Sequence, residues 1–307
     1  MQGFEKEAER ARSAAGEDLD GLIYHPAPAV LLALLDNPAL DEPKLSLLLA
    51  RKDLPVEVLE EIGARKALLK NYAVKKALLF HPRTPRLVGL RLLKDLYLMD
   101  LVQFALSVSA PAELKRYAEE QVVARLPQLP LGQKVTLARR GPARVAGALL
   151  ADGHAQVLPV ALENPFLTEA QVLRALAREK VPTVVVQALA KHRKWSQAYN
   201  VRLALVRNPS SPISIVLGFL PLLTISDLRE LAAPGVVPEN LRKYLEAEVR
   251  RRMLASQKHA EREIRPSDAP LFPQAGDEQR PKEEEHGGEG ERGSHRHRGP
   301  EEPDDEA

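Results

Sequence analysis

The 307-residue sequence contains no cysteine. Disulfides, thiolate metal sites and cysteine nucleophiles are therefore excluded. It also has no run of about 18 apolar residues, so we expect no membrane-spanning helix. The charged start, with Glu5, Lys6 and Glu7, lacks the apolar core of a secretory signal. Together with the absence of cysteine, this start leads us to expect a cytoplasmic protein.

Groups that commonly carry out catalysis are also missing from the sequence. No glycine-rich phosphate loop follows a strand, because no strand is predicted at all. The carboxylate pairs, such as Glu60-Glu61, are neighbours in sequence and diverge by about 100° on a helix. Ser107 and Ser109 have no His or Asp partner at a recognisable spacing. We therefore expect a protein that is not an enzyme and that uses no cofactor and no metal.

A recurring phrase that ends in proline is the main feature of the sequence. Its closing prolines are separated by 44, 45, 38 and 44 residues; they are Pro38, Pro82, Pro127, Pro165 and Pro209. In three copies a tyrosine stands ten residues before the proline; these tyrosines are Tyr72, Tyr117 and Tyr199. A fixed period of this length is typical of stacked helical repeats.

Each period holds three short helices with proline near their starts, where proline is favoured. In the first full repeat, helices are predicted after Pro43 and Pro55 and from Asn71 to Phe80. Apolar stripes at helical spacing support them, for example Leu45, Leu48 and Leu49, or Leu87, Leu90 and Leu93. We predict an all-α fold, a right-handed α-solenoid of about five three-helix repeats with a period near 44 residues.

The solenoid is predicted over residues 17–255. Residues 1–16 are predicted to form an N-terminal helix or cap, and 17–36 a partial first unit. The third repeat, 128–165, is short and rich in glycine, which lowers its helix propensity. Residues 256–307 hold 8 Lys and Arg against 15 Asp and Glu and few apolar residues. They are predicted to be a disordered acidic tail, because they bury too little surface to offset the entropy of ordering.

Three phrases link the chain to a known class of repeats: Asn37-Pro38-Ala39-Leu40, Asn164-Pro165-Phe166-Leu167 and Tyr199-Asn200-Val201-Arg202. Because of these three phrases, residues 17–255 resemble the HEAT/armadillo class of α-solenoids, and especially the bacterial leucine-rich-repeat-variant proteins. The resemblance implies a stack of helices with a curved binding surface. One protein of the variant class carries a cysteine-ligated iron–sulfur cluster, which a chain without cysteine cannot hold.

Clusters of cations are the candidate ligand-binding residues. The densest is Lys191 to Trp195, which includes the only tryptophan. A cationic patch with an aromatic ring can hold a phosphate and stack a base, although a charged, solvated turn is the simpler interpretation. The candidates are Lys75, Lys76, Arg91, Lys94, Arg139, Arg140, Lys191, Arg193, Lys194 and Trp195.

Histidines offer a weaker case for ligand binding. His25 and His81 precede proline where other repeats have asparagine, so we predict that they bond free helix carbonyls and bind no metal. His286, His295 and His297 stand in the predicted tail, where a flexible segment does not preorganise ligands.

These observations favour a monomeric scaffold that binds a protein or peptide on a helical repeat surface. The alternative is a nucleic-acid-binding repeat protein, motivated by a body of 36 Lys and Arg against 27 Asp and Glu over residues 1–255.

Overall fold

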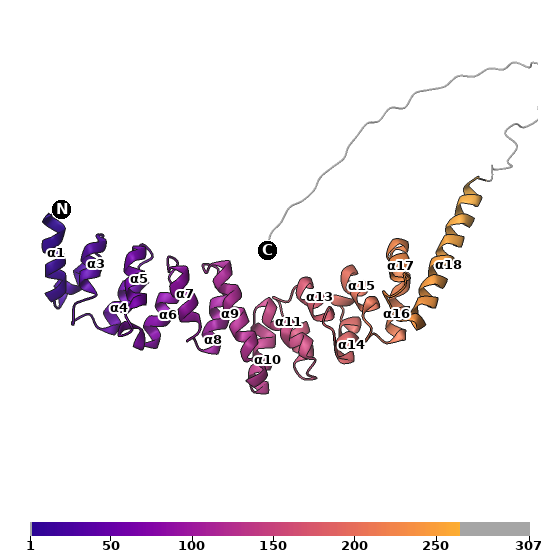
Figure 1. Cartoon of the computed structure of the whole chain (residues 1–307), viewed down its shortest axis with the longest axis horizontal. Coiled ribbons are helices and arrows are strands. Elements are labelled where there is room, and N and C mark those ends of the chain that lie inside the picture. Colours follow the sequence, from indigo (N-terminus) through magenta and orange to yellow (C-terminus); the bar gives the residue numbers. More distant parts are fainter. Residues whose placement is uncertain (1, 265–307) are drawn as a thin grey trace, which may run out of the picture. The chain divides into compact units, whose positions relative to one another are not determined.

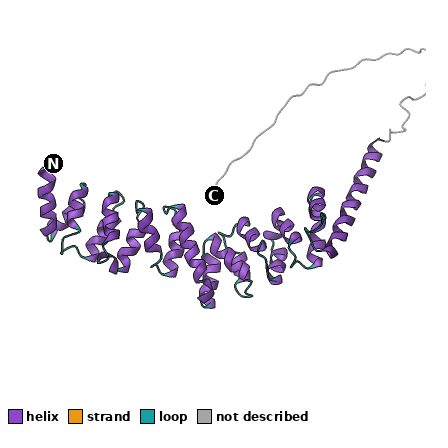
Figure 2. Cartoon of the chain, viewed as in Figure 1, coloured by secondary structure: helices purple, strands orange, loops and turns teal. Residues whose placement is uncertain are grey.

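The computed structural model describes residues 2–264, and this part of the chain consists of helices joined by short loops (Figure 2). It contains eighteen α-helices and four short 3₁₀ helices, and no strand occurs between residues 2 and 264. The all-helical prediction is thereby confirmed for these residues. Backbone contacts divide the chain into Met1–Lys258 and His259–Ala307. Of the second unit, only the residues up to Ile264, which end the last helix, are described.

The helices follow one another in groups of three, which we call triplets (Figure 1). The first three triplets are α1 (Gln2–Ser13), α2 (Glu17–Leu22), α3 (Pro28–Leu34); α4 (Glu42–Ala50), α5 (Val56–Ala64), α6 (Tyr72–Phe80); and α7 (Arg86–Leu93), α8 (Leu98–Leu106), α9 (Ala112–Arg125). The next three are α10 (Leu131–Arg140), α11 (Ala143–Asp152), α12 (Leu158–Leu162); α13 (Glu169–Leu176), α14 (Thr183–Lys191), α15 (Tyr199–Arg207); and α16 (Ile213–Phe219), α17 (Ile225–Leu231), α18 (Glu239–Ile264). The 3₁₀ helices are η1 (Leu68–Lys70), η2 (Leu126–Gln128), η3 (Trp195–Gln197) and η4 (Leu220–Leu222).

Contacts between helices repeat with the triplet. The first helix of a triplet packs on the third in each of the first five, as α1 on α3 and α13 on α15. The third helix also packs on the next triplet: on its second helix in α3 on α5, α9 on α11 and α12 on α14, and on its first helix in α6 on α7 and α15 on α16. Leu, Val and Ala side chains fill these contacts and form one continuous buried cluster. Each unit therefore buries its apolar surface against its neighbours in sequence.

Proline and polar caps explain where many helices begin. Pro55, Pro85 and Pro182 stand at the N-cap with extended backbone, as their fixed φ favours. The Asp41 carboxylate accepts a hydrogen bond from the Lys44 amide, 3.1 Å away, and so caps α4. Thr168 stands at the N-cap of α13, but its side chain makes no cap hydrogen bond.

A buried asparagine or histidine closes most triplets. Asn37 donates to the carbonyls of Ala11 and Ala14, at 2.7 and 2.9 Å, where the first helix of its triplet ends. His81 and Asn208 reach the carbonyls of Arg51 and Leu176 at the ends of α4 and α13. Carbonyls at a helix end have no partner within the helix, so each closing residue satisfies groups that burial would otherwise leave unpaired.

The same hydrogen bonds recur after a shift of 127 residues. Asn164 donates to Ala138 and Gly141, at 2.8 and 3.0 Å, which repeats the bonds of Asn37 residue for residue. Three further hydrogen bonds recur with the same shift. The bond of Tyr72 to Asp100 corresponds to that of Tyr199 to Asp227, the bond of Thr84 to the Leu78 carbonyl to that of Ser211 to the Leu205 carbonyl, and the bond of Arg125 to the Leu96 carbonyl to that of Arg252 to the Leu223 carbonyl. The first three triplets and the last three are thus two similarly built halves.

The structure adds detail to the sequence-based prediction in four places. Residues 2–13 belong to a complete first triplet, because α1 packs on α3 and Asn37 bonds its end. The glycine-rich third repeat, 128–165, forms all three of its helices. Leu87 is 73% exposed, and Val88 is buried in its place. Helix α18 continues through residues 256–264, where the tail was predicted to begin, and the rest of that tail lies outside the described residues.

Candidate functional site

Four of the predicted ligand-binding residues take part in internal contacts. The Lys75 and Lys76 ammonium groups pair with Asp95 at 3.0 Å and Asp100 at 2.7 Å. The Trp195 ring is only 2% exposed, and its Nε1–H donates to the Leu162 carbonyl at 3.1 Å. This ring is therefore not available to stack a base. Lys194 covers it, with Nζ 4.2 Å from the ring centroid.

The remaining predicted cations lie at three separate helix ends. They are Arg91 and Lys94 at the end of α7, Arg139 and Arg140 at the end of α10, and Lys191 and Arg193 at the end of α14. All six are exposed, and none has an ion-pair partner among the residues whose side chains the structure describes. Cations are favoured at helix C-termini by the helix dipole, which accounts for their positions without a ligand.

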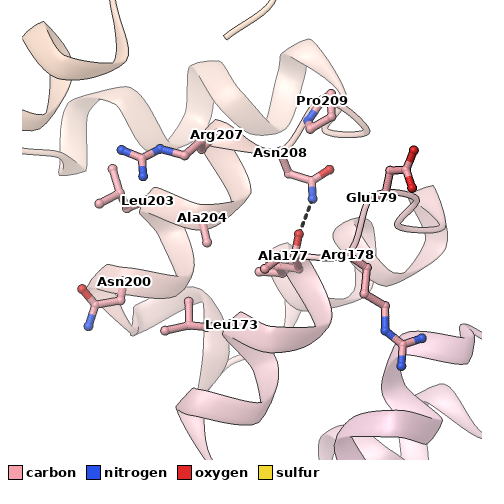
Figure 3. A pocket seen from close by; sticks show the side chains of 11 residues that line it. Leu173, Ala177, Arg178, Glu179, Asn200, Leu203, Ala204, Arg207, Asn208 and Pro209 are labelled. Carbon is pink, nitrogen blue, oxygen red and sulfur yellow. Dashed lines mark hydrogen bonds between the residues drawn. The ribbon is translucent and has the colours of Figure 1, made fainter. Parts of the chain in front are cut away.

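A groove of about 580 Å³ runs between α13 and α15, within the fifth triplet (Figure 3). Its floor is mainly apolar and is formed by Leu173, Leu176, Leu203 and Ala204. Asn208 is buried at one end and donates to the Leu176 carbonyl at 2.8 Å, which joins the ends of the two helices. An apolar floor with a few polar groups at its edge is typical of sites that bind small molecules or peptide side chains.

Charged residues border this groove, but only some of them are paired. Arg207 pairs with Glu230 at 2.7 Å, and Asn200 donates to Glu169 at 3.0 Å. Arg178 and Glu179 also line the groove; in Figure 3 the Arg178 side chain extends away from Leu203. Arg178 has no hydrogen-bond or ion-pair partner among the described side chains.

Arg178 also borders a second recess of about 230 Å³, which is formed by α9, α11 and α13. Arg144 and Arg174 contribute to the same recess. Arg144 is neutralised by Glu119 and Glu120, which lie 3.8 and 2.6 Å from it. Burial nevertheless raises the pKa of Glu119. Arg174, like Arg178, is exposed and has no partner among the described side chains.

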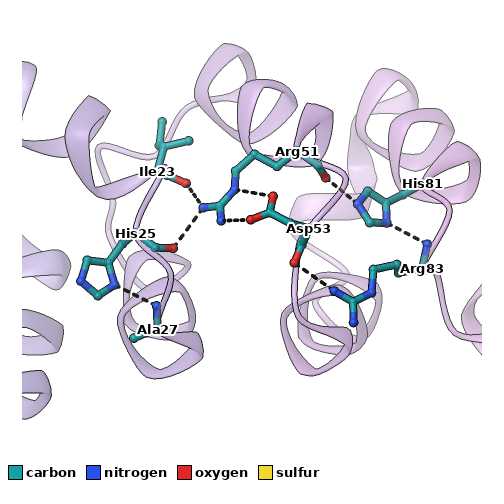
Figure 4. A network of polar contacts seen from close by, with 7 residues as sticks. All are labelled: Ile23, His25, Ala27, Arg51, Asp53, His81 and Arg83. Atoms are coloured by element: carbon teal, nitrogen blue, oxygen red, sulfur yellow. Dashed lines mark hydrogen bonds and ion pairs between the residues drawn. The ribbon is translucent and has the colours of Figure 1, made fainter.

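The first half of the chain shows what the equivalent arginine does there. Arg51, 127 residues before Arg178, donates to the carbonyls of Ile23 at 2.6 Å and His25 at 3.1 Å (Figure 4). It also makes two bonds to the Asp53 carboxylate, at 3.2 and 2.8 Å, and these lower the pKa of Asp53. In the second half Lys180 stands in place of Asp53. The acid that holds Arg51 has thus been replaced by a cation beside Arg178.

The groove itself also differs between the halves. Leu203 and Arg207 stand where the first half has Lys76 and Phe80. There, the Phe80 ring packs edge-on against Phe104, with centroids 5.3 Å apart, and Lys76 pairs with Asp100. At the position of Lys76, which pairs internally in the first half, the second half therefore has Leu203, an apolar residue of the groove floor. At the position of Phe80 it has Arg207, which pairs with Glu230.

The predicted bond to a carbonyl at a helix end is confirmed for His81. Its Nε2 lies 2.6 Å from the Arg51 carbonyl, and its Nδ1 accepts a hydrogen bond from the Arg83 amide at 3.2 Å (Figure 4). Burial lowers the pKa of His81, which favours the neutral ring that these bonds require. His25 Nδ1 accepts from the Ala27 amide, and its Nε2 lies 3.2 Å from Glu7. His286, His295 and His297 lie outside the described residues.

Neither free arginine was singled out by the sequence. Arg174 lies on α13 and Arg178 lies two residues after its end. Their spacing of four residues was the available clue, because side chains four apart lie on one side of a helix. Between residues 2 and 264 no cluster of three His, Asp or Glu side chains is arranged to hold a metal ion. No helix in this range is both long and apolar enough to cross a membrane. Comparisons with protein-family models, curated proteins and solved structures found no match.

Proposed function

We propose that this protein is a non-enzymatic scaffold that binds a protein or peptide in the groove between α13 and α15. The observation that carries the proposal is the groove's composition, an apolar floor within one triplet with Asn200, Arg178 and Arg207 along its edge. Its volume of about 580 Å³ is sufficient for two or three side chains of a peptide. Each large apolar side chain buried there contributes about 1.5–3 kcal/mol to binding.

We further propose that the triplets form a right-handed α-solenoid of the HEAT/armadillo class, as the resemblance to leucine-rich-repeat-variant proteins implies. The recurring contacts between first and third helices support this arrangement. So do the bonds of Asn37, His81 and Arg125, which join the ends of the first and third helices in the three triplets of the first half. Solenoids present extended surfaces made of equivalent positions, and these surfaces commonly receive peptides. We place the protein in the cytoplasm as a monomer, in keeping with its lack of cysteine.

Nucleic-acid binding is the alternative function, favoured by the six exposed cations at the ends of α7, α10 and α14. Its strongest element, a cation beside a stacking aromatic ring, is weakened by the burial of Trp195. A fluorescein-labelled 20-nucleotide single strand, titrated at about 50 mM salt, separates the two functions, because phosphate contacts are strongest at low salt. Tight binding that weakens steeply with added salt would favour the alternative.

The direct test is to pan a phage-displayed library of random 12-residue peptides against the full chain. Selected peptides are then measured by fluorescence anisotropy on Asn200→Trp, which places an indole over the groove. Asn200 is exposed, so the variant is expected to fold. Ala73→Trp is the matched control, because Ala73 is the exposed equivalent of Asn200 on α6.

We expect Asn200→Trp to weaken binding at least tenfold and Ala73→Trp to leave it unchanged. Circular dichroism confirms that both variants are folded. A library that yields no peptide sensitive to Asn200→Trp would overturn the proposed function.

A further inference from the structure

We propose that the groove recognises an acidic peptide, in which a carboxylate binds Arg174 and Arg178 while a neighbouring apolar side chain enters the groove. This proposal rests on the proposed function, since it names the kind of peptide that the groove accepts. Three observations support it. The two guanidinium groups are unpaired among the described side chains, they share a recess that meets the groove at Arg178, and the first half of the chain uses the equivalent of Arg178 internally.

The two arginines lie close together. Both line the recess formed by α9, α11 and α13, and Arg178 lines the groove as well. The only other cation of the recess, Arg144, is neutralised by two glutamates. The recess is therefore left with two exposed guanidinium groups that no described side chain compensates.

The pairing found in the first half indicates that Arg178 is left free by a change of its surroundings. Arg51 is held by two carbonyls and by Asp53, and only about 10% of its side chain is exposed. At the position of Asp53 the second half has Lys180, which is exposed and adds positive charge beside Arg178. Glu179 follows Arg178 and lines the groove, but it forms no ion pair with either arginine. An arginine without an internal carboxylate partner is suited to bind a carboxylate of another molecule.

The chemistry of the neighbouring groove selects the class of partner. Guanidinium groups bind carboxylates through paired, charge-assisted hydrogen bonds, which add geometric specificity to the attraction. The adjoining floor of Leu173, Leu176 and Leu203 is aliphatic and offers no aromatic ring on which a nucleic-acid base would stack. A segment with an acidic residue beside a large apolar residue satisfies both surfaces at once.

The test uses the peptides selected by panning, each resynthesised with a fluorescein label and in a second form with Asp and Glu replaced by Asn and Gln. Binding is measured by anisotropy on the full chain and on Arg174→Gln, Arg178→Gln and the double variant. Arg139→Gln is the matched control, because Arg139 is also an exposed cation without an ion-pair partner among the described side chains, at the end of another helix.

We expect enrichment of acidic residues among the selected peptides and a tenfold or greater rise in Kd for each single arginine variant. The peptides with Asn and Gln in place of Asp and Glu are expected to bind the full chain as weakly as the original peptides bind the double arginine variant. Arg139→Gln is expected to change Kd less than twofold. Peptides that require an open groove but are insensitive to both arginine variants would overturn this inference and leave the proposed function standing. Displacement of the peptide by a 20-nucleotide single strand at equal concentration would also overturn it. A library without any groove-dependent peptide would overturn both proposals.

Discussion

Replacing His81 tests whether the residue that closes a triplet stabilises it. In His81→Ala, two hydrogen bonds are lost, one to the Arg51 carbonyl and one from the Arg83 amide. Each contributes about 1 kcal/mol, and a buried carbonyl left without a partner costs about 1–3 kcal/mol more. The ring is 6% exposed, so water does not readily replace it. We therefore expect a loss of about 3–5 kcal/mol in the free energy of unfolding.

His81→Asn is the informative companion, because Asn37, Asn164 and Asn208 close three other triplets with the same kind of bond. We expect this variant to stay within about 1 kcal/mol of the wild type, since the amide supplies the same donor and acceptor. His154→Ala is the control: His154 is exposed and accepts one bond from the Gln156 amide. Exposed changes of this kind stay within about 0.5 kcal/mol.

Urea unfolding followed by circular dichroism measures all three variants, and hydrogen exchange locates the loss in residues 42–81. The His81 ring also makes stability depend on pH. Its pKa is lowered in the folded protein, so its contribution is present above the unfolded value of about 6.5 and is lost as pH falls through the folded value. His81→Asn is expected to remove this dependence. Equal stability of His81→Ala and His154→Ala, or equal damage by His81→Asn and His81→Ala, would refute the reasoning.

Three further predictions test other contacts. Burial and the bond to Asp100 raise the pKa of Tyr72 to about 12. Tyr72→Phe is therefore expected to lower the free energy of unfolding in urea by about 1–2 kcal/mol below pH 10. Tyr117→Phe, which breaks no described hydrogen bond, is expected to lower it by less than about 0.5 kcal/mol. Bonds from Arg251 and Arg252 lower the pKa of Glu248 to about 2, so its contribution to the stability of the fold is present above pH 4.5 and is lost as pH falls towards 2. Acid unfolding that is identical in Glu248→Gln and wild type would contradict this. A Cβ on Gly63 would lie 2.7 Å from Val88, whereas one on Gly218 meets nothing within 4 Å. Thermal unfolding is therefore expected to show a loss of about 1–3 kcal/mol in the free energy of unfolding for Gly63→Ala and no loss for Gly218→Ala.

The repeat period and most helix boundaries were predictable from the sequence because proline acts locally. Pro55 and Pro182 exclude helix at the residue before them and favour it after them, whatever the rest of the chain does. The role of His81 was also predictable, since asparagine stands at the equivalent position of other repeats. Both inferences use information contained in a few neighbouring residues or in a comparison of copies.

The features that the sequence did not reveal depend on contacts between distant residues. Trp195 stands in the most basic run of the chain, but its ring is buried and donates a hydrogen bond to the Leu162 carbonyl, 33 residues earlier. Leu87 fits a helical stripe, yet the contacts of α7 bury Val88 instead. Whether an arginine such as Arg51 or Arg178 is free depends on which residue stands two positions later and on carbonyls of the preceding triplet. Composition and local spacing do not contain that information.

The shift of 127 residues provides an internal comparison that a single repeat does not. Where equivalent residues make the same bond in both halves, as Asn37 and Asn164 do, the need to fold is enough to explain why they are present. Positions that change, such as Arg178 and Leu203, are those where the second half has given up an internal contact. These changes gather at the groove between α13 and α15, which is why we locate binding there and not on the equivalent surface of the first half.

Hydrogen–deuterium exchange of the full chain, with and without a saturating selected peptide, tests the location of binding most directly. We predict slower exchange in residues 169–179 and 199–209, and unchanged exchange in the equivalent segments 42–52 and 72–82. Protection of both pairs of segments to the same extent, or protection that avoids residues 169–179 and 199–209, would contradict binding in this groove.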